Sequence, residues 1–145
     1  MSTTPNLIEE AKTTLLSLHE LTKRFGDGFI PDAHAVLARQ SDIVRLHLEV
    51  GQEMAKKFGA KESRYLARKI EEAKQYRHGR IELKKTASDS TQDALLAVGE
   101  EFQAEFDSAE EYESYRILMQ SLDRAFHHAS QVISFVSKAD SRSQH

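Results

Sequence analysis

The feature that most constrains the fold of this chain is an apolar pattern in its last third. Eight residues follow one another at alternating steps of three and four: Tyr112, Tyr115, Met119, Leu122, Phe126, Ala129, Ile133 and Val136. This heptad spacing places all eight side chains on one face of an α-helix. Ser108, followed three residues later by Glu111, has the form of a capping box. We therefore predict a helix from Ser108 to Lys138.

The apolar face of this predicted helix is wider than a two-stranded coiled coil requires. Leu118, Ala125 and Val132 add a third apolar column beside the heptad positions. A stripe of this width is typical of a helix that packs against several others. The pattern fits a bundle core, an oligomer interface or both. Because a third column exceeds what one short chain needs to cover, we predict self-association through the eight heptad residues.

Apolar spacing and breaker residues divide the rest of the chain into further helices. The first is predicted over residues 5–25, and a turn-rich loop follows over residues 26–31. A second helix restarts at Asp32 and runs to Phe58, where Gly59 marks either its end or a kink in one rod that extends to about Lys85. Ser90, with Asp93, is predicted to cap a fourth helix that ends at Asp107. The short Asp107–Ser108 step fits either a turn or a kinked continuation.

Composition agrees with an all-α fold of four to five helices. The 145 residues include two prolines and no cysteine, so disulfides and thiolate ligands are excluded. We predict a single helical domain over residues 1–138 and a disordered polar tail over residues 139–145. The sequence contains no basic and apolar leader and no stretch long enough to span a membrane, which favours a cytoplasmic protein.

Charge is distributed along the chain in two opposed blocks. Residues 56–88 hold eleven Lys and Arg against four Glu, whereas residues 89–113 hold nine Asp and Glu without a Lys or Arg. A basic block of this size is typical of a surface that binds a polyanion. The acidic block can pair with the basic one, shield it or bind a basic protein partner.

The basic block also contains aromatic residues, and this combination suits single-stranded nucleic acid. Cations neutralise phosphates, while flat rings stack on unpaired bases. The predicted nucleic-acid-binding residues are Lys57, Lys61, Arg64, Tyr65, Arg68, Lys69, Lys74, Tyr76 and Arg77. An equally good interpretation is a solvated helix whose cations pair with nearby glutamates and with the acidic segment 89–113.

No pattern in the sequence indicates catalysis. His127 and His128 are adjacent, so on a helix they point about 100° apart and cannot chelate one ion from one face. Asp123 and His127 are correctly spaced for two ligands, but such a pair is more often a hydrogen bond on a helix face. The two glycines at 26 and 28 lack the Lys-Ser/Thr end of a phosphate-binding loop. We predict a protein that is not an enzyme and that needs no cofactor or metal.

The order of elements from residue 35 to 138 resembles a known family. A basic helix (residues 64–76), a polar connector (residues 88–90) and a last helix that ends in residues 129–135 are similar to the UvsY-type recombination mediators of T4-like phages. The resemblance implies a ring-like homo-oligomer that binds single-stranded DNA through the basic helix, assembles through its C-terminal helix and helps to load a recombinase. The residues that match the basic region are Arg64, Arg68, Lys69, Lys74 and Arg77. The acidic run departs from this pattern and predicts either pairing between subunits or a protein partner.

Two functional hypotheses follow. The first is a non-enzymatic homo-oligomer that binds single-stranded nucleic acid, as a phage-type recombination mediator would. The second is a protein–protein interaction module, such as an assembly chaperone, adaptor or inhibitor, without affinity for nucleic acid. Binding to oligonucleotides that weakens as salt rises separates the two.

Overall fold

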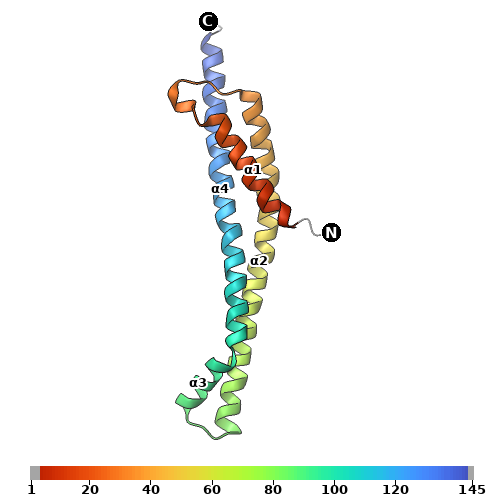
Figure 1. Cartoon of the computed structure of the whole chain (residues 1–145), viewed down its shortest axis with the longest axis vertical. Coiled ribbons are helices and arrows are strands. Elements are labelled where there is room, and N and C mark those ends of the chain that lie inside the picture. Colours follow the sequence, from red (N-terminus) through yellow and green to blue (C-terminus); the bar gives the residue numbers. More distant parts are fainter. Residues whose placement is uncertain (1–3, 144–145) are drawn as a thin grey trace. The chain divides into compact units, whose positions relative to one another are not determined.

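The computed structural model of the chain describes the backbone of residues 4–143 and the side chains of residues 7–142. This part of the chain forms four α-helices: α1 (Thr4–Thr22), α2 (Ala33–Ile81), α3 (Ala87–Ala97) and α4 (Gly99–Ser143) (Figure 1). A single turn of 3-10 helix, Phe25–Asp27, follows α1, and Gly28 ends it in the left-handed region at φ +83°. The described residues contain no strand, which confirms the all-α prediction.

The helices divide into two compact units. Unit 1 comprises Met1–Glu53 and Tyr115–His145, and unit 2 comprises Met54–Ser114. Helices α2 and α4 therefore contribute one part of their length to each unit. The second and third predicted helices are one continuous helix, because α2 passes through Gly59 without a break.

The last two predicted helices also differ from the structure. The break between helices falls at Val98, and α4 runs without interruption through Asp107 and Ser108. The capping box predicted at Ser108 is therefore wrong. Val98 is completely buried, so its burial holds the chain at the point where the backbone leaves α3 for α4. Helix α4 also continues to Ser143, so residues 139–143 of the expected disordered tail are helical, and residues 144–145 lie outside the described part.

The start of α3 lies four residues earlier than the sequence indicated. Thr86 is the N-cap residue, and its side chain accepts a hydrogen bond of 3.1 Å from the backbone N–H of Asp89. Ser90, which was predicted to be the cap, lies inside α3 and is fully buried. Both residues are hydroxyl-bearing residues in a polar segment, and local pattern alone does not distinguish them.

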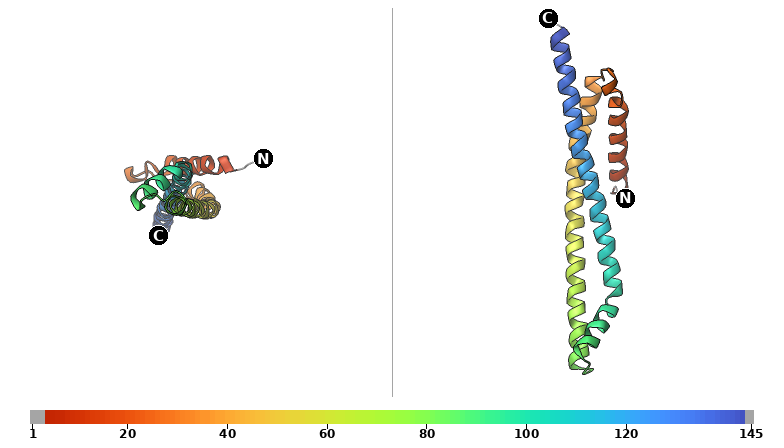
Figure 2. Two further views of the ribbon diagram at one scale, coloured as in Figure 1. Left: turned by 90° about the horizontal axis from the view of Figure 1, so that it is seen from below. Right: turned by 90° about the vertical axis from the view of Figure 1, so that its left-hand side faces the viewer.

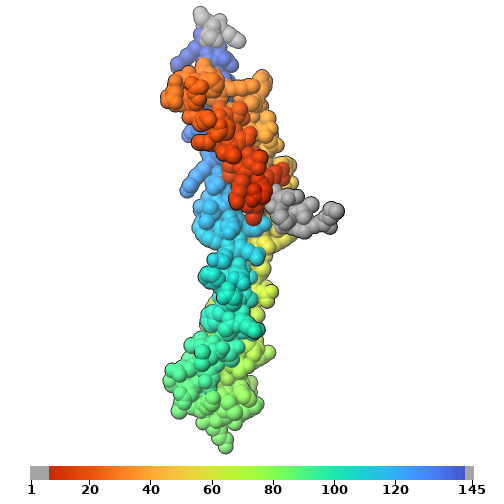
Figure 3. Space-filling view, viewed as in Figure 1, coloured from red at the N-terminus to blue at the C-terminus, as the bar shows by residue number. Residues whose placement is uncertain are grey.

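The core of unit 1 is formed by α1 and by the parts of α2 and α4 that belong to this unit. Helix α1 lies across the other two, and its side chains cover them in the space-filling view (Figures 1, 2 and 3). The buried apolar residues are Ala11 and Leu18 of α1, Val36, Ile43, Leu46 and Val50 of α2, and Tyr115, Leu118, Leu122, Ala129, Val132 and Val136 of α4. Each helix thus buries one apolar stripe, as the 3.6-residue period requires.

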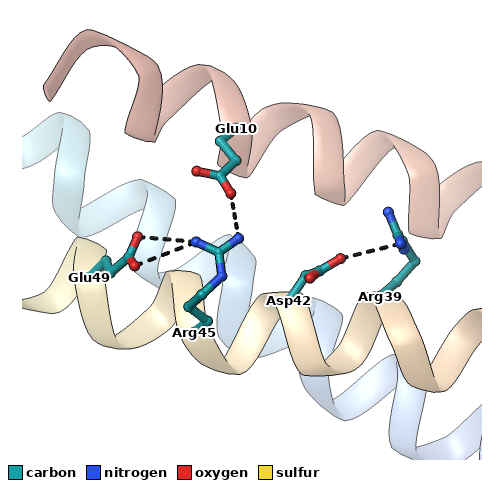
Figure 4. A network of polar contacts seen from close by, with 5 residues as sticks. All are labelled: Glu10, Arg39, Asp42, Arg45 and Glu49. Carbon is teal, nitrogen blue, oxygen red and sulfur yellow. Dashed lines mark hydrogen bonds and ion pairs between the residues drawn. The ribbon is translucent and has the colours of Figure 1, made fainter. Parts of the chain in front are cut away.

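Polar contacts on the surface of unit 1 join α1 to α2 and link residues along α2. Arg45 of α2 donates hydrogen bonds to Glu10 of α1 and to Glu49 one turn further along α2, the latter at 3.3 Å (Figure 4). Arg39 and Asp42 form a separate ion pair of 3.4 Å. These side chains are 36–46% exposed, so each pair contributes at most about 1 kcal/mol to stability. The apolar core, and not this network, therefore holds α1 in place.

Helix α3 packs closely against α2 in unit 2. Gly79 of α2 is buried against Ser90 of α3, and a Cβ atom placed on Gly79 would lie 2.9 Å from Ser90 Oγ and 3.4 Å from Ser90 Cα. Ser90 Oγ is buried without a hydrogen-bond partner among the described residues. Glycine at position 79 therefore permits an approach between the two helices that any larger residue would prevent.

We expect the substitution Gly79→Ala to destabilise unit 2 by about 1–3 kcal/mol, because the added methyl group overpacks the contact with Ser90. The matched control is Gly59→Ala in the same helix, where nothing lies within 4 Å of the added Cβ. That change should instead stabilise the protein by roughly 0.5–1 kcal/mol, since alanine favours the helix. Urea unfolding followed by circular dichroism measures both. Equal effects of the two substitutions would contradict the close α2–α3 contact.

Candidate nucleic-acid interface

All nine predicted nucleic-acid-binding residues lie on α2 within unit 2, but the structure divides them into two groups. Lys57, Lys61 and Arg68 are engaged with other side chains of the same unit. The other six are exposed on the helix surface: Arg64, Tyr65, Lys69, Lys74, Tyr76 and Arg77. The spacing of Lys57, Lys61 and Arg68 places these three residues on the side of α2 that faces α4.

Arg68 is an internal residue of unit 2 and not a surface cation. Only 7% of it is exposed. Its guanidinium donates hydrogen bonds to Glu105 through Nε and to Glu72 through Nη1, the latter at 3.1 Å. The ring centroids of Phe102 and Tyr65 lie 4.1 and 5.4 Å from its central carbon. The hydrogen bond to Glu105 raises the pKa of Arg68, while burial acts in the opposite direction. A residue that binds nucleic acid must face solvent, so the burial of Arg68 removes it from the predicted interface.

Lys57 and Lys61 lie beside an aromatic pair that joins α2 to α4. The rings of Phe58 and Tyr112 are 5.6 Å apart, and the Lys61 ammonium is 5.1 Å from the Tyr112 centroid. Lys57 forms an ion pair of 2.9 Å with Glu111. Both lysines are half-buried, so binding a phosphate would require them to leave these contacts. We therefore remove both from the candidate interface.

The basic and acidic blocks pair with each other inside unit 2. Contacts that join a cation of residues 56–88 to a carboxylate of residues 89–113 include Lys57 with Glu111, Arg68 with Glu105 and Lys85 with Asp93. The alternative interpretation of the basic block, in which it is neutralised by the acidic segment, is therefore correct for these three cations. The sequence contained this signal in the adjacent blocks of opposite charge, but not the identity of the pairs.

The six exposed residues span about four turns of α2 but lie on different sides of it. Tyr65, Lys69 and Tyr76 share one side, Lys74 and Arg77 point about 100–160° away from Tyr76, and Arg64 lies on the side toward α4. Tyr65 and Tyr76 are 41% and 38% exposed. Lys69 lies 5.9 Å from the centroid of the Tyr65 ring and 3.9 Å from a carboxylate oxygen of Glu72. Lys74 and Arg77 form no hydrogen bond or ion pair with any residue that the structure describes. Their charges are thus available to an external anion, and we call these six residues the α2 strip.

Arg64, at one end of the α2 strip, lines a cavity of about 260 Å³ together with Ala67, Glu100, Glu101 and Ala104. Glu101 Oε2 is buried there without a hydrogen-bond partner among the described residues. Two carboxylates oppose one guanidinium in this cavity, so the net charge does not favour a phosphate. Arg64 can therefore contribute to anion binding only from the solvent side of the cavity.

The residues predicted to form the oligomer interface are largely used within the chain. Tyr115, Leu122, Ala129 and Val136 are buried in unit 1, while Tyr112 is half-buried against Phe58 in unit 2. Met119, Phe126 and Ile133 are half-buried. The third apolar column was the reason to expect surplus apolar surface, yet its members Leu118 and Val132 belong to the core of unit 1. That reason for self-association is therefore wrong.

The histidines do not form a metal site with other ligands in the described residues. Nowhere in residues 7–142 do three or more His, Asp or Glu side chains group closely enough to hold an ion. Asp123 and His127 are 3.6 Å apart on the exposed surface of α4, and His128 lies 3.1 Å from the Thr22 hydroxyl. The first contact lies along α4, and the second connects α4 to α1.

Comparison with protein-family models, with curated proteins and with solved structures finds no match to this chain. None of the described helices combines the length and the apolar character that crossing a membrane requires.

Proposed function

We propose that this protein is a non-enzymatic, oligomeric helical protein that binds single-stranded nucleic acid through the α2 strip. The observation that carries the proposal is the arrangement of exposed cations and rings over residues 64–77 of one helix. Lys69 lies against Tyr65, and Tyr76 follows on the same side of the helix, while Lys74 and Arg77, which have no partner in the described residues, lie on other sides of it. Both types of side chain that unpaired nucleotides require are thus adjacent.

The chemistry of the α2 strip suits single strands better than duplex. Lysine and arginine neutralise phosphates regardless of sequence, and the exposed tyrosine faces stack on bases that are not already paired. The rigid helix holds the two tyrosines three turns apart, so they contact separate nucleotides. Binding of this kind is independent of base identity and weakens with salt.

A role as a recombination mediator of the phage type is the more specific form of this proposal. Its support is the resemblance in the order of elements and the exposure of four of the five matching basic residues, namely Arg64, Lys69, Lys74 and Arg77. The fifth, Arg68, is part of the protein interior and would not contact DNA. The site is consequently smaller than the sequence predicted.

We expect Tyr76→Ala to weaken binding of a fluorescent oligo-dT by about 1–3 kcal/mol, because one stacking ring is lost. Tyr76→Phe keeps the ring and should bind as the wild type does. Fluorescence anisotropy at several salt concentrations measures both. The logarithm of the affinity should fall with the logarithm of salt by roughly 0.7 per phosphate contacted, and so by at most about 3 per protomer for four cations.

Equal oligonucleotide binding by Tyr76→Ala and Tyr76→Phe would show that the Tyr76 ring does not stack on a base. Absence of binding at low salt would end the nucleic-acid proposal altogether. It would favour the second candidate, a protein–protein interaction module. A specific observation supports that candidate: Leu66, Ile70 and Ile81 are more than half exposed on the same helix. Exposed aliphatic residues of this kind are typical of surfaces that bind proteins.

A further inference from the structure

One side of α2 in unit 2 combines aliphatic residues with cations and contains no acid. Leu66, Ile70, Lys74, Arg77 and Ile81 follow at steps of four, four, three and four, so they share one side of the helix. All are exposed, and Leu66, Ile70 and Ile81 are 57%, 56% and 61% exposed. This side is opposite to buried Arg68, since Ile70 follows Arg68 by two residues, or about 200°. We call these five residues the basic apolar face.

Helix α4 carries a counterpart of opposite charge within the same unit. Phe102, Phe106, Glu110 and Glu113 follow at steps of four, four and three, and all four are exposed. Phe102 and Phe106 are 41% and 57% exposed, although one side of Phe102 contacts Arg68. Large exposed aromatic residues beside carboxylates are poorly explained by solubility alone. We call these four residues the acidic apolar face.

The two faces match in spacing as well as in charge. The steps of four, four and three occur in both, and the first four residues of each face are two apolar residues followed by two charged ones, while Ile81 has no counterpart on the acidic apolar face. When the two helices run parallel, Leu66 faces Phe102, Ile70 faces Phe106, Lys74 faces Glu110 and Arg77 faces Glu113. An antiparallel arrangement would instead place cations on the phenylalanines and carboxylates on the aliphatic residues. Charge complementarity therefore favours helix α4 of a second copy as the occupant and a parallel orientation of the two helices.

We propose that the acidic apolar face of one copy docks in parallel on the basic apolar face of a second copy of this chain. Two apolar pairs bury surface at one end of the contact, and two ion pairs align the helices at the other end. This inference deepens the oligomeric part of the proposed function and rests on it. It also replaces the heptad residues of the last helix as the self-association surface, because those residues are largely buried in unit 1.

The positions of the two faces determine the type of assembly. Within unit 2, α2 and α4 contact each other through Arg68 with Glu105 and through Phe58 with Tyr112. The basic apolar face lies on the side of α2 that is turned away from these contacts. On α4, Phe106, Glu110 and Glu113 point away from Glu105 and Tyr112, whereas Phe102 also contacts Arg68. One copy therefore presents them in different directions and cannot use both with the same neighbour. Such an interface is heterologous and produces a ring or an open chain rather than a two-fold dimer.

Self-association and nucleic-acid binding compete on this surface. Lys74 and Arg77 belong both to the basic apolar face and to the α2 strip, so a docked α4 occupies cations that would otherwise bind phosphate. The carboxylates of the acidic apolar face thus take the place that phosphates of nucleic acid would occupy. A variant whose acidic face is disabled should lose self-association and at the same time bind oligonucleotide more tightly than the wild type.

The test uses the full chain with the substitutions Lys74→Glu and Glu110→Lys, alone and together. Light scattering at rising concentration reports mass. We expect the wild type to exceed the monomer mass of 16.5 kDa at low salt and each single variant to associate about tenfold or more weakly, because like charges then face each other. The double variant should associate as the wild type does, since the pair is restored with reversed charges. Lys12→Glu on α1 makes the same charge change away from both faces and should leave the mass unchanged.

Several results would overturn the proposal: a wild type that stays monomeric at high concentration, single variants that associate normally, or a double variant that remains dissociated. Circular dichroism verifies that every variant is folded. Oligo-dT binding by Glu110→Lys separates this proposal from the proposed function. Reversible assembly with rescue but without oligonucleotide binding supports the interface and ends the nucleic-acid function. Oligonucleotide binding without any assembly would support the nucleic-acid function and overturn the interface between copies.

Discussion

Replacing Arg68 by glutamate is expected to unfold unit 2, the largest effect of any single charge reversal in this chain. Arg68 is 7% exposed and holds Glu105 and Glu72 through charged hydrogen bonds. The substitution would place three carboxylates together in a site that excludes most water. It would also remove the cation that lies 4.1 Å from the Phe102 centroid. Uncompensated buried charge is among the strongest destabilising changes in proteins.

Thermal unfolding followed by circular dichroism measures this effect. The matched control is Arg77→Glu, which makes the same charge change on the same helix at an exposed position without a partner in the described residues. It should alter the free energy of unfolding by no more than about 0.5 kcal/mol. Combining Arg68→Glu with Glu105→Arg restores opposite charges and should recover part of the lost stability. A stable Arg68→Glu variant would return Arg68 to the candidate nucleic-acid interface.

The second large effect is expected at Leu122, which is completely buried in unit 1. Leu122→Ala should lower the free energy of unfolding by about 2–5 kcal/mol, because it removes buried apolar atoms and leaves a cavity. The matched control is Leu16→Ala on α1, where the leucine is 61% exposed and the loss should be within about 0.5 kcal/mol. Denaturant titration provides both values.

Leu122 also distinguishes the two roles that the heptad pattern allowed. The oligomer interpretation expects Leu122→Asp with Phe126→Asp to yield smaller but folded particles. Burial of Leu122 leads us to expect loss of the helical signal from unit 1 instead. Phe126→Asp alone should be milder, because Phe126 is only half-buried. A double variant that keeps its helicity and loses mass would restore the last helix as the association surface.

Several features of this protein could be derived from local sequence. The all-α class follows from helix-forming residues with few breakers, and the loop after the first helix follows from its glycines and Pro31. The opposed charge blocks are visible in composition, and they do pair. These features depend on neighbours within one or two helical turns, so a single sequence contains the necessary information.

Other features depend on which segments meet in space. Gly59 and Gly79 are both glycines in α2, but only Gly79 meets another helix, at Ser90. Lys57, Arg64 and Arg68 look alike in the sequence. The positions of Glu111 and Glu105 make Lys57 half-buried and Arg68 internal, whereas Arg64 is exposed. The third apolar column on the last helix could be read from the sequence, but its partner could not. Whether α1 or another copy covers it is set by tertiary packing, because a helical period specifies which residues share a face but not what that face contacts.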